Sequence, residues 1–139
     1  SHEYWVYRHL EQYMRLKGYT NVEVILPTGE FTYITVYDKI NAMSHGLGIR
    51  YAGGIGGIEV PLKRMVTQEN SIIPADMYWL GHMHTYLVLT KVRMGGSVIG
   101  YSEFSRHFRF APEVPKMQFQ LLDKRRGYTL NEPIILTDF

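Results

Sequence analysis

The segment that most constrains this chain is a short apolar run that ends in two histidines, Asp76 to Leu80 followed by Gly81-His82-Met83-His84. Such a run is typical of a buried strand, because it is rich in aromatic and aliphatic residues and is bounded by glycine. On an extended segment the side chains at positions i and i+2 lie on the same side. A strand that continues into His82 and His84 would direct two imidazoles to one point, which predicts a site for a transition metal.

A third histidine, His45, occupies a similar position. It lies in Ser44-His45-Gly46, after the apolar segment 38–44 and before a glycine-rich loop over 46–57. Three neutral imidazoles can hold one zinc ion and leave a position open for water, whose pKa the metal would lower to about 7. The residues alone leave a second interpretation open, in which these histidines are structural. A cupin-like barrel is disfavoured, because it would need a glutamate after the second histidine and the segment 85–94 contains no acid.

The hydrophobic periodicity predicts an α+β layered domain made mostly of strands with two helices. Helices are expected over 1–16 and 59–68, the first ended by Lys17-Gly18. A hairpin is expected from 22–26 and 31–37, and a turn at Gly95-Gly96 is expected to join paired strands within 85–98. The remaining strands are expected over 38–44, 76–80, 116–122 and 128–136.

Length and composition exclude several classes of protein. At 139 residues the chain fits a single domain, 1–139, and its net charge of +2 gives no large basic field for nucleic acid. It has no cysteine, which excludes disulfides, thiolate metal sites and a cysteine nucleophile. No apolar run approaches the ~20 residues of a membrane span, and no signal-peptide pattern opens the chain. We therefore expect a cytoplasmic protein with no membrane partner.

Taken together, these segments resemble one family. The run from Asp76 to His84 closely resembles the last motif of calcineurin-like metallophosphoesterases, an apolar strand ending in Gly-His-x-His. Ser44-His45-Gly46 resembles the single-histidine motif that precedes it there, and the segment 95–104 resembles the stretch after Gly-His-x-His in phage-type members. The resemblance runs from about Asp38 to the C-terminus and so covers most of the chain.

The resemblance implies a two-metal phosphoesterase. In that family the lone histidine and the first histidine of Gly-His-x-His bind one metal, which corresponds to His45 and His82. The second histidine binds the other metal and corresponds to His84. The implied reaction is hydrolysis of a phosphodiester or phosphomonoester by a metal-activated hydroxide, with nucleic acid as one candidate substrate. The implied cofactors are divalent metal ions (Mn, Zn, Fe or Mg), and the implied fold is half of a layered α/β/β/α metallophosphoesterase-like sandwich.

The earlier motifs of that family do not occur in this sequence. Asp-x-His, Gly-Asp and Gly-Asn-His, which supply the carboxylate between the metals and further ligands, are all missing. The chain therefore resembles the C-terminal half of such an enzyme, and we assign it no catalytic side chain of its own. The other half is expected from a partner chain, or the chain is expected to form a homodimer. The alternative is a non-catalytic metal-binding or assembly module that retains the fold.

Three other segments could bind phosphate or nucleic acid, but each has a structural explanation. Two arginines and His107 alternate with phenylalanines in 104–110, a pattern that could stack bases, although a core-facing strand or loop explains it better. Lys124-Arg125-Arg126 is typical of a charged hairpin turn. The segment 53–57 lacks the Lys-Ser/Thr end of a P-loop, so we expect a loop that approaches the metal site.

Overall fold

The computed structural model describes residues 2–27, 29–50, 57–107 and 111–137. The chain divides into two compact units, residues 1–32 and 33–139, and each is described by itself. The predicted glycine loop falls largely on residues 51–56, which lie outside the described residues, as do Phe108, Arg109 and Phe110.

The first unit consists of a helix and an irregular segment. Helix α1 spans His2–Leu16, as predicted. It ends in a Schellman motif, in which the N–H groups of Gly18 and Tyr19 bond to the carbonyl oxygens of Arg15 (3.0 Å) and Met14 (3.1 Å). Gly18 has φ +72°, which explains the glycine there. The strand predicted over 22–26 is wrong, because that segment is irregular and pairs with no neighbouring strand.

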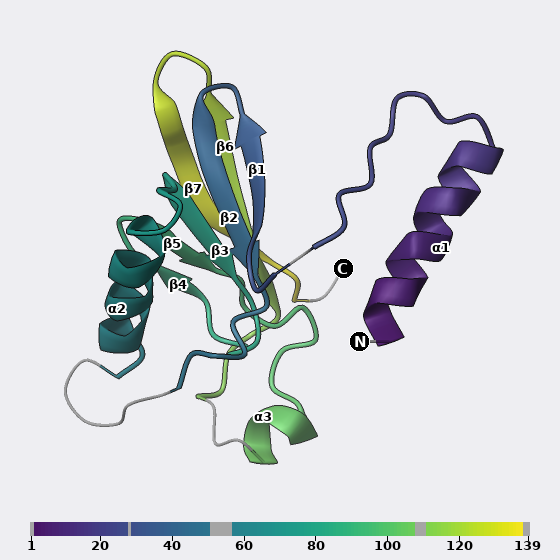
Figure 1. Cartoon of the computed structure of the whole chain (residues 1–139). Coiled ribbons are helices and arrows are strands. Elements are labelled where there is room, and N and C mark those ends of the chain that lie inside the picture. Colours follow the sequence, from purple (N-terminus) through teal and green to yellow (C-terminus); the bar gives the residue numbers. More distant parts are fainter. Residues whose placement is uncertain (1, 28, 51–56, 108–110, 138–139) are drawn as a thin grey trace. The chain divides into compact units, whose positions relative to one another are not determined.

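The second unit is built on a five-stranded sheet with the order β1-β2-β3-β5-β4 (Figure 1). Strand β2 runs parallel to β3, and β3 runs parallel to β5, whereas β4 and β5 are antiparallel. The predicted hairpin joined 22–26 to 31–37. In the structure β1 instead forms a hairpin with β2, and only Tyr37 and Asp38 separate the two strands. The strands are β1 Thr32–Val36, β2 Lys39–Ser44, β3 Met77–Leu80, β4 Leu87–Val88 and β5 Val92–Met94.

Helix α2, Glu59–Asn70, covers one face of this sheet, close to the helix predicted over 59–68 (Figure 1). The hydroxyl of Tyr78 on β3 donates to Asn70 Oδ1 on α2 at 3.0 Å. Tyr78 and Leu62 are both fully buried, so the helix and the sheet share a core. Burying apolar side chains of this size contributes about 1.5–3 kcal/mol each, so this layer stabilises the fold.

A two-stranded sheet covers the other face. Strands β6, Lys116–Asp123, and β7, Gly127–Ile135, form the antiparallel hairpin that the sequence predicted. Asn41 Oδ1 on β2 accepts hydrogen bonds from Trp79 Nε1 (2.8 Å) and from the Tyr128 hydroxyl on β7 (2.7 Å). The second unit is therefore a three-layer α+β structure made mostly of strands, as predicted.

The inner face of this hairpin carries several polar side chains, and its outer face is mostly apolar. Gln120 on the inner face accepts a hydrogen bond from the buried guanidinium of Arg93, from Nε to Oε1 at 2.8 Å. The alternate residues point outward and are exposed. The outer face carries the exposed apolar side chains of Met117, Phe119, Leu121, Leu130 and Ile134, together with Glu132, which pairs with Phe119 across the strands.

Two details of the predicted fold need correction. The turn expected at Gly95-Gly96 lies earlier, because Leu89 and Val92 bond to each other and β5 ends at Met94. A third helix, α3, spans Glu103–His107 and was not predicted. Its single turn is too short to produce a periodic pattern, which is why only two helices were expected.

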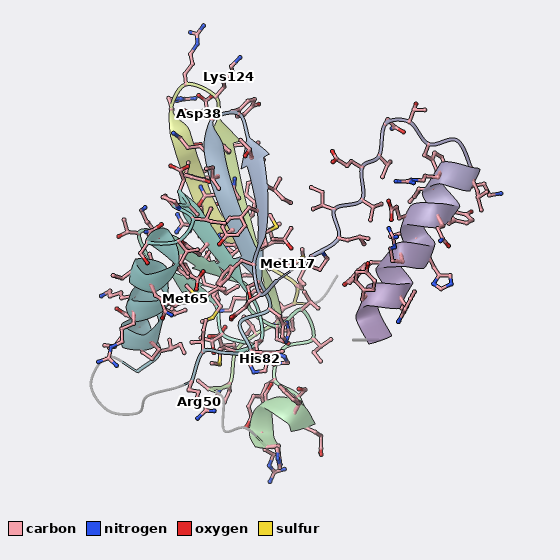
Figure 2. The ribbon with its side chains drawn as sticks, in the orientation of Figure 1. Asp38, Arg50, Met65, His82, Met117 and Lys124 are labelled. Carbon is pink, nitrogen blue, oxygen red and sulfur yellow. The ribbon has the colours of Figure 1, made fainter. Side chains whose placement is uncertain are left out.

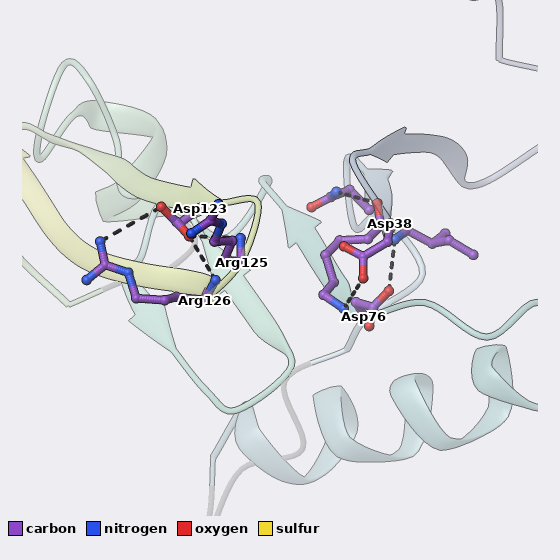
Figure 3. A network of polar contacts seen from close by, with 8 residues as sticks. Asp38, Asp76, Asp123, Arg125 and Arg126 are labelled. Atoms are coloured by element: carbon purple, nitrogen blue, oxygen red, sulfur yellow. Dashed lines mark hydrogen bonds and ion pairs between the residues drawn. The ribbon is translucent and has the colours of Figure 1, made fainter.

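Hydrogen bonds fix the end of the sheet at which β3 begins (Figure 3). The N–H of Asp76 donates to the carbonyl of Ile40 at 2.8 Å, and the Asp76 carboxylate accepts the N–H of Ile40 at 2.9 Å. The β6–β7 turn is held in a similar way, since Asp123 Oδ1 accepts the N–H groups of Arg125 (2.9 Å) and Arg126 (2.8 Å). This confirms Lys124-Arg125-Arg126 as a charged hairpin turn.

Candidate metal centre

The predicted histidines follow the carboxyl ends of two parallel strands. Ser44, the last residue of β2, pairs with Leu80, the last residue of β3. His45 and Gly81 come next on their chains, so the two loops leave the sheet side by side. Figure 2 shows His82 at the end of the strands opposite to Asp38 and Lys124. This edge of a parallel sheet is where α/β proteins bind ligands.

His82 and His84 are not on a strand, which corrects the geometry predicted for them. Strand β3 ends at Leu80, and the N–H of Met83 bonds to the carbonyl of Gly81 at 2.8 Å across His82. With φ +67° at His82, this is a γ-turn of the rare, strained kind. His84 has φ +50°. Left-handed backbone at two non-glycine residues is unusual, and such strain is concentrated at functional sites.

The γ-turn brings the His82 ring against His45. His82 Nδ1 lies 3.2 Å from His45 Nε2, and the ring centroids are 5.0 Å apart at an interplanar angle of 67°. Two imidazoles bound to one tetrahedral zinc, each about 2.0–2.1 Å from it, would place their nitrogens about 3.3 Å apart. The observed distance fits a shared metal as well as a hydrogen bond between the rings.

A glycine lies in each of the two loops where they meet. Gly46 has φ +87°, and a Cβ there would lie 3.6 Å from the carbonyl oxygen of Gly81 and 3.9 Å from His82 Cβ. A Cβ on Gly81 would lie 3.7 Å from His45 Nδ1. The loop after β2 is fixed further by the N–H of Gly46, which donates to Ser44 Oγ at 3.1 Å. The Ser-His-Gly and Gly-His-x-His segments therefore pack directly against each other.

The surroundings of His82 favour its neutral form. Burial lowers the pKa of His82 below its ordinary value of 6.5, and positive charge on His45 and on His84 would lower it further. His45, in contrast, is exposed. A neutral imidazole is the form that binds a metal, so the lowered pKa of His82 favours metal binding by this ring at neutral pH.

His84 lies against helix α3. Its Nδ1 is 3.5 Å from Ser105 Oγ, and its ring lies 5.0 Å from the Phe104 ring, with 36° between the planes. Ser105 is buried, with 2% of its surface exposed. Sequence reasoning missed Ser105, and only its position between the aromatic residues of 104–110 could have suggested it.

The structure thus brings His45 and His82 into contact and holds His84 through other partners. Within the described ranges, no group of three or more His, Cys, Asp or Glu side chains is arranged to hold a metal ion. The assignment of His45, His82 and His84 as metal ligands therefore stays a prediction. His107 ends α3, and its predicted neighbours at 108–110 lie outside the described residues.

A hollow of about 730 Å³ lies elsewhere, between α2 and the β4–β5 hairpin. Its lining includes Lys63, Lys91 and Arg93 and none of the three histidines. The Lys91 ammonium donates to the carbonyl of Ala75 at 3.2 Å, and Arg93 is bonded to Gln120. Since these cations already have protein partners, the hollow does not compete with the histidines as a candidate site.

No family model matches the chain, and no curated protein sequence matches it. Among solved structures, the Zn²⁺ complex of wild-type Vps29 from Entamoeba histolytica is similar at 17% identity and a TM-score of 0.49, over 82% of this chain and 66% of that one. Vacuolar protein sorting 29 from Cryptosporidium parvum is similar at 14% identity and a TM-score of 0.49, over 84% of this chain and 62% of that one.

The chain therefore spans 62% to 66% of the length of these two proteins. Vps29 has a calcineurin-like metallophosphoesterase fold. Similarity at this level does not assign the chain to a family.

Among the residues that the structure describes, none of the helices has the length and apolar character needed to cross a bilayer.

Proposed function

We propose that this chain supplies the histidine side of a two-metal phosphoesterase site, with His45 and His82 binding one divalent ion and His84 the other. One observation carries the proposal: His45 Nε2 and His82 Nδ1 lie 3.2 Å apart at the carboxyl ends of parallel strands. The separation suits two ligands of one metal. The strained backbone at His82 supports it, since strain is retained where function requires it.

The side chains have separate roles in this proposal. His82, partly buried and held neutral, fixes the metal from the protein side, while the exposed His45 completes the pair from the solvent side. When bound, the metals supply positive charge that stabilises phosphoryl oxygens and activates water. The substrate class is therefore a phosphodiester or phosphomonoester, whose negative charge would otherwise repel an anionic nucleophile.

The proposal includes a partner chain that supplies carboxylates. Two divalent cations close together repel each other, and three neutral imidazoles bring no negative charge to offset this. The outer face of the β6–β7 hairpin offers a place for such a partner, because its five apolar side chains are exposed on one side of the sheet. We therefore infer that a segment carrying aspartates near the metals docks on this chain.

Metal binding can be tested on the chain alone. Calorimetric titration with Zn²⁺ or Mn²⁺ should show binding that His82→Ala and His45→Ala each weaken by at least about 100-fold, since each removes one of few ligands. His9→Ala is the matched control, because His9 Nδ1 pairs with the Trp5 carbonyl within α1 at 2.7 Å. Wild-type binding in both site variants, or no binding in the wild type, would refute the proposed site.

Hydrolysis needs a second experiment with the partner present. The chain is assayed with bis(p-nitrophenyl) phosphate and Mn²⁺, first alone and then with the polypeptide encoded directly upstream of it. We expect turnover only in the mixture, lost in His84→Ala and in Phe119→Asp, which places a charge on the outer face. If metal binds but neither preparation hydrolyses the diester, the phosphoesterase proposal is wrong and the chain is a metal-binding module.

A further inference from the structure

A tight turn after strand β5 carries two exposed aliphatic side chains at its tip. The N–H of Gly100 donates to the carbonyl of Ser97 at 3.2 Å, which makes Val98 and Ile99 the central residues of a β-turn. Their exposed fractions are 58% and 69%. Turns favour glycine, proline, asparagine, aspartate and serine, so the turn itself does not explain a Val-Ile tip.

The base of this turn is fixed to the start of β6. The carbonyl of Ser97 also accepts the N–H of Lys116, at 3.0 Å. Gly100 has φ +69°, and a Cβ there would lie 2.8 Å from the ring of Pro115, which explains the glycine. The fold therefore holds the tip in place while its aliphatic groups stay in contact with water.

A second turn, after strand β2, has the same character. The N–H of Ile49 donates to the carbonyl of Gly46 at 3.1 Å, and Leu47 within this turn has an exposed fraction of 71%. The strands β2, β3 and β5 are parallel neighbours in that order, so their carboxyl ends lie at one edge of the sheet. The two aliphatic tips therefore belong to the loops on either side of the histidine segment 81–84.

Arginines accompany the two tips. Arg50 is exposed, follows Leu47 by three residues, and lies at the same end of the strands as His82 (Figure 2). Arg106 is exposed on α3, the helix after the second tip, which also carries Glu103. The excess of positive charge is small, so any surface that binds here is recognised mainly through the aliphatic groups.

We propose that these tips bind the surface of a lipid bilayer, with Leu47, Val98 and Ile99 in the acyl region and Arg50 and Arg106 at the phosphate groups. Stable protein interfaces bury about 800 Å² on each partner, and two narrow turns offer little flat area for one. Insertion requires only that the aliphatic side chains leave water, and arginines strengthen it on anionic lipid. The proposal goes beyond the proposed function and needs no metal.

This proposal revises our expectation that the chain has no membrane partner, because that expectation considered only segments that span a bilayer. It is tested by co-sedimentation of the chain with vesicles of equal parts phosphatidylcholine and phosphatidylserine. We expect the wild type to sediment with the vesicles and Ile99→Asp to partition at least about tenfold more weakly, since a charge replaces an aliphatic group. Arg50→Gln should weaken binding less, by about fivefold, and only on the anionic vesicles.

The matched control is Ile72→Asp. Ile72 is exposed to nearly the same extent as Ile99, at 66%, but lies before the start of β3 instead of after the end of a strand. Its substitution should leave the partition unchanged. If Ile99→Asp and Ile72→Asp partition equally, or if the wild type stays in the supernatant, the tips do not bind lipid and are left to a protein partner.

Fluorescence separates insertion from adsorption at the surface. Ile99→Trp and Ile72→Trp are each mixed with vesicles that contain brominated lipid, and the quenching is compared with that of the wild type, which has Trp5 and Trp79. We expect additional quenching in Ile99→Trp and none in Ile72→Trp. Equal quenching in these two variants would overturn the proposal even if the chain sediments with vesicles.

Discussion

The two ends of the parallel strands β2 and β3 are built in opposite ways. Where β3 begins, Asp76 and Ile40 exchange main-chain and side-chain hydrogen bonds at 2.8 and 2.9 Å, and the left-handed residue near them, Tyr37 with φ +58°, lies in the tight β1–β2 turn. Where β3 ends, His82 and His84 have left-handed backbone, and the His82 ring approaches the ring of His45. The hydrogen bonds at the first end stabilise the fold. The second end has a strained backbone and two imidazole rings in contact, which a purely structural role does not explain.

The largest effect on stability is expected at the paired end. Asp76→Ala would remove the acceptor of the Ile40 N–H and leave that donor unpaired, which should lower the free energy of unfolding by about 1–3 kcal/mol. Metal affinity should not change, because the histidines lie at the other end. Urea denaturation and a zinc titration on the same sample measure both quantities.

The control for this change is Asp38→Ala. Asp38 is exposed and forms a surface ion pair with Lys39 at 3.1 Å, so its loss should leave the urea midpoint nearly unchanged. The comparison between the two ends would break down if Asp76→Ala weakened zinc binding as strongly as His82→Ala does.

The next effect is expected at Gly46. Its φ of +87° is unfavourable for any residue with a Cβ, so Gly46→Ala should cost about 1–2 kcal/mol and displace His45 from His82. Gly81→Ala is the matched control, because the added Cβ would lie 3.7 Å from His45 Nδ1, an ordinary contact. The melting temperature of Gly46→Ala should therefore be lower than that of Gly81→Ala. The reverse order would show that the positive φ at Gly46 does not affect stability.

A smaller effect of opposite sign is expected at His82. Glycine adopts positive φ without the steric cost of a Cβ, so His82→Gly should keep or raise the free energy of unfolding, by up to about 1 kcal/mol, while zinc binding is lost. Most substitutions instead destabilise, typically by about 1 kcal/mol. His45→Gly is the matched control, because it removes the same kind of ligand at a residue without positive φ. If His45→Gly and His82→Gly had equal free energies of unfolding, the strain proposed at His82 would be contradicted.

The elements that the sequence predicted well are those with local signals. The helix α1 has its Gly18 end, α2 has its helical periodicity, and the β6–β7 hairpin has a charged turn between two strands rich in apolar residues. The errors at 22–26 and at Gly95-Gly96 concern strand pairing. Strand β5 pairs in parallel with β3, a contact between distant parts of the chain that local periodicity does not encode.

The site divides in the same way. The residue pattern selected His45, His82 and His84, and the structure places the first two rings in contact. The γ-turn at His82 could not be predicted, because it follows the end of β3. The position of that end depends on the pairing of Leu80 with Ser44 of β2, which local sequence does not encode. Ser105 could not be predicted either, because α3 is too short for a periodic signal.

The smallest effect expected is the dependence of stability on pH. The pKa of His82 is lowered in the folded chain, chiefly by burial and then by the neighbouring histidines. Above the ordinary value of 6.5 both folded and unfolded chains hold this ring neutral, so its contribution to stability is fully present. As the pH falls below 6.5, the unfolded chain binds the proton first, and the free energy of unfolding decreases until the folded pKa is passed.

His82→Asn removes this titration, so its urea midpoint should decrease less than that of the wild type between about pH 7.5 and about pH 5.5. Saturating zinc should enlarge the difference, because a metal that binds only the folded chain adds stability and competes with protons for the same nitrogens. If wild type and variant lose stability in parallel with and without zinc, His82 is not desolvated beside His45. The contrast between the two ends of β3 would then rest on backbone geometry alone.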